Sequence, residues 1–127
     1  MTAILVGGEA EGEVLTLGAP LSFWGGYDPE EGRIIDVHHP QHGESLAGKI
    51  LAMTHGRGSS SSSAVLAEAL RLGTGPAAIV LGEADPILVT GVLVARMLYG
   101  VSCPVLVAEI SGSGRWRVSD RGIEPSG

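Results

Sequence analysis

Short stretches of β-forming residues alternate with turn-forming residues over the first half of the chain. Three such stretches, residues 13–17, 33–37 and 48–53, are bounded by glycine, proline, aspartate or histidine. Runs of this length between turn-forming residues predict short strands joined by tight connections. The N-terminal half is therefore expected to be rich in strands.

The second half of the chain begins with a helical pattern. In the stretch "SSSAVLAEALRLG" the apolar residues Val65, Leu66, Ala69 and Leu70 fall on one face, and the pattern ends at Gly73. Apolar residues at this spacing predict an amphipathic helix, and a glycine directly after the last turn is a common C-terminal cap.

A second helix is predicted to run from Asp85 to about Tyr99. Asp85 suits the N-cap position, Pro86 suits the first helical position, and Gly100 follows the last apolar residue. This arrangement of Asp, Pro and Gly is typical of the two ends of a helix.

The apolar run over residues 77–81 predicts a strand covered on both faces, and residues 104–110, after the second helix, predict another buried strand. Residues 115–119 are a candidate edge strand, and residues 120–127 are expected to form a frayed tail. The resulting α-β-α-β half, with right-handed crossovers, joins the strand-rich half in a single α/β domain over residues 1–127.

Composition narrows the class of protein. With 127 residues, 44% hydrophobic and 17% charged, the chain is expected to form one globular domain. A net charge of -6 with a single lysine argues against a nucleic-acid partner, because phosphate binding needs clustered cations. The acidic N-terminal stretch does not resemble a signal peptide, and no apolar run approaches the roughly 20 residues of a membrane helix. A cytoplasmic protein without membrane contact is expected.

The single cysteine, Cys103, excludes an internal disulfide and any iron–sulfur cluster or structural zinc held by this chain's own thiolates. Its apolar surroundings in the sequence indicate a small buried hydrophobic residue.

His38, His39 and His42 are candidate metal ligands by residue type, but no acidic or thiol ligand stands at matching spacing. Turn or hydrogen-bonding roles are favoured for these histidines, and no metal site is predicted.

The five serines of "GRGSSSSS" follow a predicted strand and lead directly into the first predicted helix. Gly56 and Gly58 permit a tight connection, and the serines then occupy the N-cap and the first turn. The unpaired N–H groups there, the positive end of the helix dipole and Arg57 predict an anion site. A capped helix with solvated serines is the alternative. A P-loop is excluded because its Gly-Lys-Ser/Thr ending is missing.

Four stretches carry a resemblance to a known family: "LSFWGGYDPEEGRIIDVHHPQHGESLAGKIL", "GRGSSSSS", "PAAIVL" and "DPILVTGVLVA". In this order they resemble the small subunit, or swivelling domain, of the aconitase X enzymes. The resemblance covers about residues 12–107, and Ser-Phe-Trp-Gly-Gly and Gly-Arg-Gly-Ser are its specific parts. It implies a swivelling β/β/α domain, the counterpart of the mobile fourth domain of aconitase.

The resemblance also implies a partner, a separate large subunit that carries a cysteine-bound iron–sulfur cluster. A chain with one cysteine agrees with a cluster held elsewhere, so no cofactor is expected on this chain alone. Trp24, Gly25 and Gly26 are implied to form a loop that faces the partner's cluster and binds substrate, with Phe23 and Trp24 excluding water. The alternative is that the two aromatic side chains anchor the loop to the core.

The implied chemistry is dehydration of a small carboxylate substrate. Ser59, directly after Gly58, resembles the family's catalytic base, and Arg57, Gly58 and Ser60 are implied to contribute to substrate binding. The helix N-terminus and Arg57 are the local features that could stabilise a serine alkoxide. A run of five serines leaves Ser60 to Ser63 as further candidates for the base.

Two substrates stay open, because bacterial members of this family dehydrate cis-3-hydroxy-L-proline and archaeal members dehydrate phosphomevalonate. The motifs look closer to the bacterial two-subunit form, and a phosphate substrate calls for more basic residues near the serines. Cis-3-hydroxy-L-proline is therefore preferred. The alternative of another class is a non-catalytic anion-binding or regulatory module. A neighbouring reading frame for a larger chain with a cysteine triad would distinguish the two classes.

Overall fold

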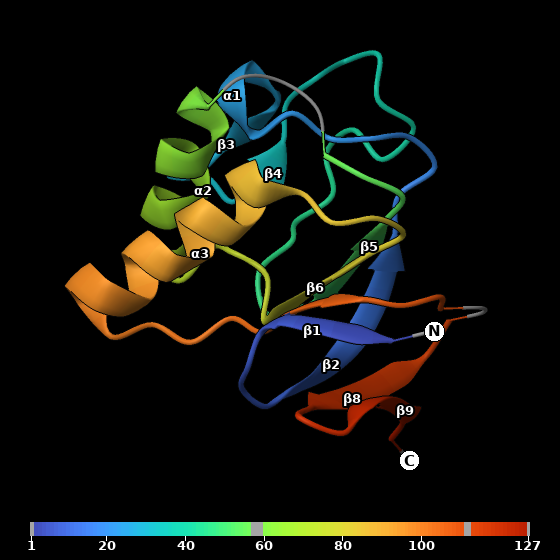
Figure 1. Cartoon of the computed structure of the whole chain (residues 1–127). Helices are drawn as coiled ribbons and strands as arrows, with labels where there is room; N and C mark the ends of the chain where they lie inside the picture. Colours follow the sequence, from blue (N-terminus) through green and yellow to red (C-terminus); the bar gives the residue numbers. More distant parts are fainter. Residues whose placement is uncertain (1, 57–59, 111–112, 127) are drawn as a thin grey trace.

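A curled sheet runs through the centre of the molecule. The computed structural model describes residues 2–56, 60–110 and 113–126, and within these residues seven strands pair in the order β1-β7-β6-β5-β2-β8-β9 (Figure 1). The seven strands are β1 (Ala3–Val6), β2 (Ala10–Thr16), β5 (Ile50–Met53), β6 (Ala78–Leu81), β7 (Val105–Val107), β8 (Arg115–Ser119) and β9 (Gly122–Pro125). The four central strands, β7, β6, β5 and β2, are parallel to one another, and β1, β8 and β9 add antiparallel edges.

Two helices, α2 (Ser61–Leu72) and α3 (Pro86–Tyr99), cover one face of this sheet (Figure 1). All four residues of β5 and all four of β6 are buried, as expected for strands between a helical layer and a second core. That second core lies on the other face, where Ile50, Val80 and Val118 pack together. The α/β class and the swivelling β/β/α architecture predicted from the sequence are confirmed.

The ends of both helices follow the predicted chemistry. The Asp85 carboxylate accepts hydrogen bonds from the backbone N–H groups of Ile87 at 2.9 Å and Leu88 at 3.4 Å, and Pro86 begins α3. Gly73 and Gly100 end α2 and α3 with φ of +80° and +68°, in the left-handed region that glycine adopts without steric cost.

Three details of the sequence prediction are wrong. The predicted strand over residues 33–37 is only two residues long, β4 (Arg33–Ile34), and it pairs with β3 (Tyr27–Asp28) in a separate hairpin outside the main sheet. The first strand, β1, was not predicted. The expected frayed tail over residues 120–127 instead contains β9, which pairs with β8 along its whole length.

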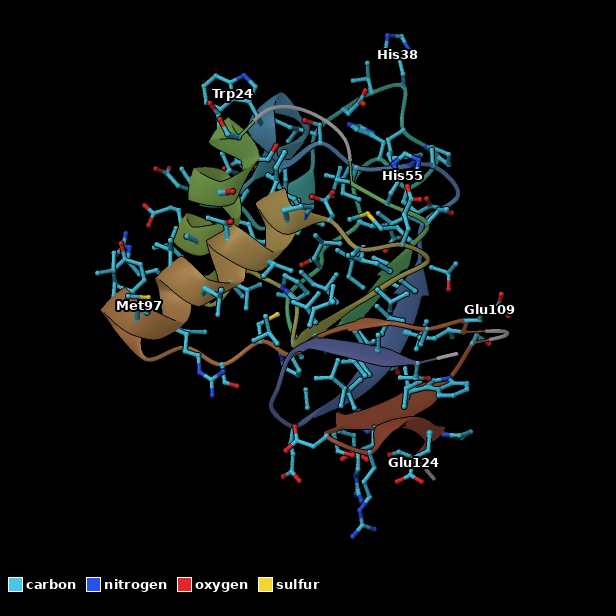
Figure 2. The ribbon with its side chains drawn as sticks, in the orientation of Figure 1. Trp24, His38, His55, Met97, Glu109 and Glu124 are labelled. Carbon is cyan, nitrogen blue, oxygen red and sulfur yellow. The ribbon has the colours of Figure 1, made fainter. Side chains whose placement is uncertain are left out.

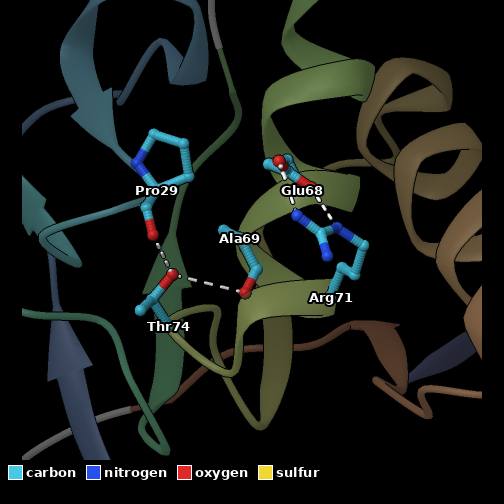
Figure 3. A network of polar contacts seen from close by, with 5 residues as sticks. All are labelled: Pro29, Glu68, Ala69, Arg71 and Thr74. Carbon is cyan, nitrogen blue, oxygen red and sulfur yellow. Dashed lines mark hydrogen bonds and ion pairs between the residues drawn. The ribbon is translucent and has the colours of Figure 1, made fainter.

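The β3–β4 hairpin is held against the C-terminal end of α2. The Tyr27 hydroxyl donates to the Thr74 carbonyl at 2.7 Å. The Thr74 hydroxyl donates to the Pro29 carbonyl at 2.6 Å, as Figure 3 shows. Burial is the main cause that raises the pKa of Tyr27, so its hydroxyl stays a proton donor. Figure 3 also shows the ion pair between Glu68 and Arg71 on the exposed side of α2, which contributes little stability there.

Among the described residues, no helix combines the length and the apolar character that crossing a membrane requires.

Cys103 is expected to be unreactive in the folded chain. It is 1% exposed, and burial raises the pKa of its thiol to about 12, so the nucleophilic thiolate is suppressed at neutral pH. A disulfide reagent added at pH 8 should label the native protein very slowly and the protein in denaturant rapidly. Equal labelling rates in the two states would contradict the buried position.

Candidate active site

The serine run begins α2, as predicted, at the end of the sheet where the parallel strands terminate. Ser60 flanks the helix and is exposed, and its side chain makes no capping hydrogen bond to the first turn. Ser61, Ser62 and Ser63 form the first helical residues. Arg57, Gly58 and Ser59, the predicted anion-binding and catalytic residues, lie outside the described residues.

Two of the five serines already have structural roles. Ser62 is 1% exposed, and its hydroxyl oxygen accepts a hydrogen bond from the backbone N–H of Trp24 at 3.2 Å. The Ser63 hydroxyl donates to the Ile87 carbonyl on α3 at 2.6 Å. A hydroxyl fixed in this way is poorly placed to take a proton from a substrate. These contacts argue against Ser62 and Ser63 as the catalytic serine.

The aromatic loop forms a single irregular turn, α1 (Phe23–Gly26), and its two aromatic side chains have different environments. Phe23 is fully buried and packs edge-to-face on Tyr27, with ring centroids 5.7 Å apart. Trp24 is 62% exposed and points outward (Figure 2). The anchoring interpretation therefore holds for Phe23, whereas Trp24 is presented to the surroundings.

The backbone of Trp24 is fixed although its side chain is exposed. Its N–H donates to Ser62, and its carbonyl accepts from the Ser22 hydroxyl at 2.9 Å. Gly25 follows with φ of +80° and open space where a Cβ would stand, so the turn depends on the conformational freedom of glycine. The aromatic turn is therefore tied to the first turn of α2 through Ser62.

The connection from β5 to α2 passes close to the start of α3. A Cβ on Gly56 would stand 2.7 Å from Oδ2 of Asp85, so only glycine fits this position without a shift of the loop or the carboxylate. The preceding residue, His55, donates from Nδ1 to the Gly56 carbonyl at 2.7 Å. The start of α3 and the β5–α2 connection are thus packed together directly before the serine run.

An open cleft of about 550 Å³ lies at the carboxyl ends of β2, β5, β6 and β7. The residues that line it are Thr16, Leu17, Ala52, Met53, Thr54, Val80, Gly82, Ala108, Glu109 and Ile110. Glu109 is the one ionisable group among these described lining residues, so the cleft has no cation to hold a phosphate or carboxylate. Sequence reasoning did not predict this cleft, because it depends on which strands are neighbours.

The three histidines of "HHPQHG" do not form a metal site. Within the described residues, no three His, Cys, Asp or Glu side chains are grouped so that they could hold a metal ion. His39 is 6% exposed and uses both ring nitrogens in hydrogen bonds to the backbone. The predicted hydrogen-bonding role is confirmed for His39.

Five described cationic side chains lie in parts of the fold other than the start of α2. Arg71 and Arg96 are in the last turns of α2 and α3, and Arg115 and Arg117 lie beside Glu11 on the edge of the sheet. Lys49 directly precedes β5, at the opposite end of that strand from the serine run. Arg57 is the basic residue that directly precedes the glycine and the serine run in sequence, and it lies outside the described residues.

The fold defines a single α/β domain in which the serine helix begins at the carboxyl ends of the parallel strands, and comparison with known proteins identifies its family. The model of the aconitase X swivel domain matches residues 2–121. The chain belongs to this family, which confirms the resemblance found in the sequence.

Relatives with two different names are similar in sequence to this chain. Over 101 residues the chain is 50% identical to the cis-3-hydroxy-L-proline dehydratase of Pseudomonas aeruginosa, covering 80% of this chain and 17% of that protein. Over 122 residues it is 39% identical to the phosphomevalonate dehydratase small subunit of Thermococcus onnurineus, covering 94% of this chain and 91% of that subunit. The chain thus spans less than a fifth of the first relative and nearly all of the second.

The fold is also that of a solved relative. The crystal structure of Thermococcus kodakaraensis aconitase X in its holo-form superposes with a TM-score of 0.83 at 35% sequence identity, covering 95% of this chain and 92% of that chain.

Substitutions of the two aromatic residues should separate their roles. Phe23→Ala should lower the free energy of unfolding by about 3–5 kcal/mol, because it removes a fully buried ring. Trp24→Ala should change it by only about 0.5 kcal/mol, because the exposed ring is lost while the backbone bond to Ser62 stays. Urea unfolding followed by circular dichroism measures both values. Equal losses would show that Trp24 is also a core residue.

Proposed function

We propose that this chain is the small, swivelling part of an aconitase X-type hydro-lyase and works with a larger chain. The observation that carries the proposal is the contact between the aromatic turn and the serine helix, in which the backbone N–H of the exposed Trp24 is bound to Ser62 in the first turn of α2. An elimination reaction needs a site shielded from water. A second surface must therefore cover this end, and a larger chain is the natural candidate.

The iron–sulfur cluster of such an enzyme does not fit the residues of this chain. Its one cysteine, Cys103, is buried and protonated, whereas a cluster is held by several thiolates. We assign the cluster and the activation of the departing hydroxyl to the larger chain. This chain is assigned the removal of the proton beside the substrate carboxylate, together with part of the substrate pocket.

Ser59 is the proposed base. A serine hydroxyl is a weak base, so it must be activated by stabilising its ionised form. The N-terminus of α2, a helix of 12 residues, supplies the positive end of a dipole for an oxyanion. Arg57 is proposed to bind the substrate carboxylate, with Gly58, Ser60 and the Trp24–Gly26 turn completing the pocket.

Cis-3-hydroxy-L-proline is the preferred substrate. The 50% identity to the Pseudomonas aeruginosa dehydratase supports it, and so does the position of five described Lys and Arg side chains in parts of the fold other than the start of α2. A phosphorylated substrate would call for several cations in the pocket. Phosphomevalonate is the second candidate, because the chain covers 91% of the Thermococcus onnurineus small subunit. Assay of the assembled complex with both compounds distinguishes the two.

Ser59→Ala should reduce kcat at least about 100-fold, since a general base is lost, while substrate binding is largely kept. Exchange of the substrate's α-hydrogen with solvent is the sharper readout, because it reports proton removal without loss of hydroxide. Ser63→Ala is a matched control in the same run. It should lower the free energy of unfolding by about 1 kcal/mol through loss of the bond to Ile87 and leave exchange normal. Exchange at the native rate in Ser59→Ala would place the base elsewhere.

The purified small chain alone should be colourless and inactive, and iron should appear only in the complex with the larger chain. The physical reason is the lack of thiolate ligands here. Visible absorption spectra and iron analysis of the separate chains test this assignment. A brown small chain with stoichiometric iron would overturn it.

A further inference from the structure

The histidine loop, defined as residues 35–43, is an irregular segment whose backbone is tied at both ends. The Ile35 N–H donates to the Gly26 carbonyl at 2.9 Å, which joins the loop to the aromatic turn. The Gly43 N–H donates to the Ile34 carbonyl at 2.8 Å and closes the loop on itself. Inside it, the His38 N–H donates to the Asp36 carboxylate at 2.9 Å.

His39 fastens the loop to the rest of the domain. The backbone N–H of Gln41 donates to Nδ1 of His39 at 3.0 Å, so Nδ1 carries a lone pair and the proton is on Nε2. Nε2 then donates to the Ala19 carbonyl at 2.9 Å. The Gln41 side chain adds a second link by accepting from the Gly18 N–H at 2.9 Å. The ring is 6% exposed, and the loop is therefore anchored by a buried neutral histidine.

This well-anchored loop holds apolar side chains in the solvent. Val37 is 70% exposed and Ile35 is 42% exposed. The bond from Ile35 to Gly26 joins the loop to the aromatic turn, which carries the 62% exposed Trp24. Clustered apolar side chains on a surface commonly mark an interface, and a loop that is ordered before binding loses little entropy when it binds.

The molecule has a second apolar surface, which offers an internal comparison. Leu93, Met97, Leu98 and Tyr99 are exposed along the C-terminal half of α3, and Met97 projects there at a distance from Trp24 and His38 (Figure 2). That surface is not linked by any described hydrogen bond to the aromatic turn or to the start of α2. The histidine loop, by contrast, is hydrogen-bonded to the aromatic turn of the candidate active site.

We propose that the histidine loop is a preformed docking loop, which places Val37 and Ile35 in an apolar surface of the larger chain next to the active site. The proposal rests on the proposed function. Two observations favour the larger chain as the occupant. The loop adjoins the end of the domain that the larger chain must cover. This domain also corresponds to 17% of the Pseudomonas aeruginosa relative, whose remaining chain is large enough to supply that surface. His39 is the positioning residue of the loop.

The test measures the affinity of this chain for the larger chain by calorimetry. Val37→Asp should raise Kd at least about tenfold, because it buries a charge in an apolar contact. Met97→Asp makes the same change at a position that is 81% exposed on α3 and should leave Kd within about twofold. At saturating larger chain the Val37→Asp complex should recover normal kcat, since Val37 is not part of the catalytic machinery.

His39→Leu provides a second, independent readout. It removes both ring hydrogen bonds and should raise Kd, whereas His39→Asn, whose side-chain oxygen can still accept from the Gln41 N–H, should be affected less. Circular dichroism of each variant separates loosening of the loop from unfolding of the domain, and Val37→Asp remains decisive if His39→Leu does not fold.

The outcomes distinguish the two proposals. If the wild-type chain does not bind the larger chain, the proposed function fails and the docking loop fails with it. If the wild-type chain binds and Val37→Asp binds equally well, the docking loop alone is overturned. A large loss of affinity in Met97→Asp with none in Val37→Asp would place the interface on α3 instead.

Discussion

The hydrogen bond from the Trp24 backbone to the buried hydroxyl of Ser62 joins two segments that are 38 residues apart in sequence. It uses a side chain in the first turn of α2 and leaves the indole ring of Trp24 exposed. Because Trp24 contributes only its backbone N–H to this bond, the position of the turn does not depend on the identity of the exposed side chain. The rest of the candidate site follows from this contact, since it places the glycine-rich turn beside the start of the serine helix.

Close packing behind this contact limits how far the helix can move. A Cβ on Gly91 would stand 2.8 Å from the Ser63 carbonyl, so α2 and α3 approach more closely than side chains would permit. The Ser63 hydroxyl reinforces the same contact through its bond to Ile87. Gly56 also packs against Asp85 at the start of α3. Contacts with α3 therefore limit the position of Gly56, before the serine run, and of Ser63, within it. The first turn of α2 is thus held in place by Ser62 and Ser63.

The separate roles of neighbouring residues explain much of the sequence. Phe23 stabilises the core and Trp24 faces outward, although they are adjacent and both aromatic. In the serine run, Ser62 and Ser63 have structural bonds, whereas Ser60 is exposed. His39 is an anchor, while His38 points into the solvent (Figure 2). A repeated residue type is therefore a poor guide to function in this chain, because burial differs from one position to the next.

The sequence by itself determined the helices, the buried central strands and the family. Asp85, Pro86 and the glycines after each helix act through local backbone chemistry, and unbroken apolar runs are a property of the chain alone. Prediction from the sequence failed for β1, β9 and residues 35–37, because an edge strand or an irregular loop is defined by partners distant in sequence. Only the tertiary structure decided that Trp24 is exposed, that Ser62 and Ser63 are occupied and that the parallel strands open into a cleft. These features arise from long-range packing and hydrogen bonds, which local sequence patterns do not contain.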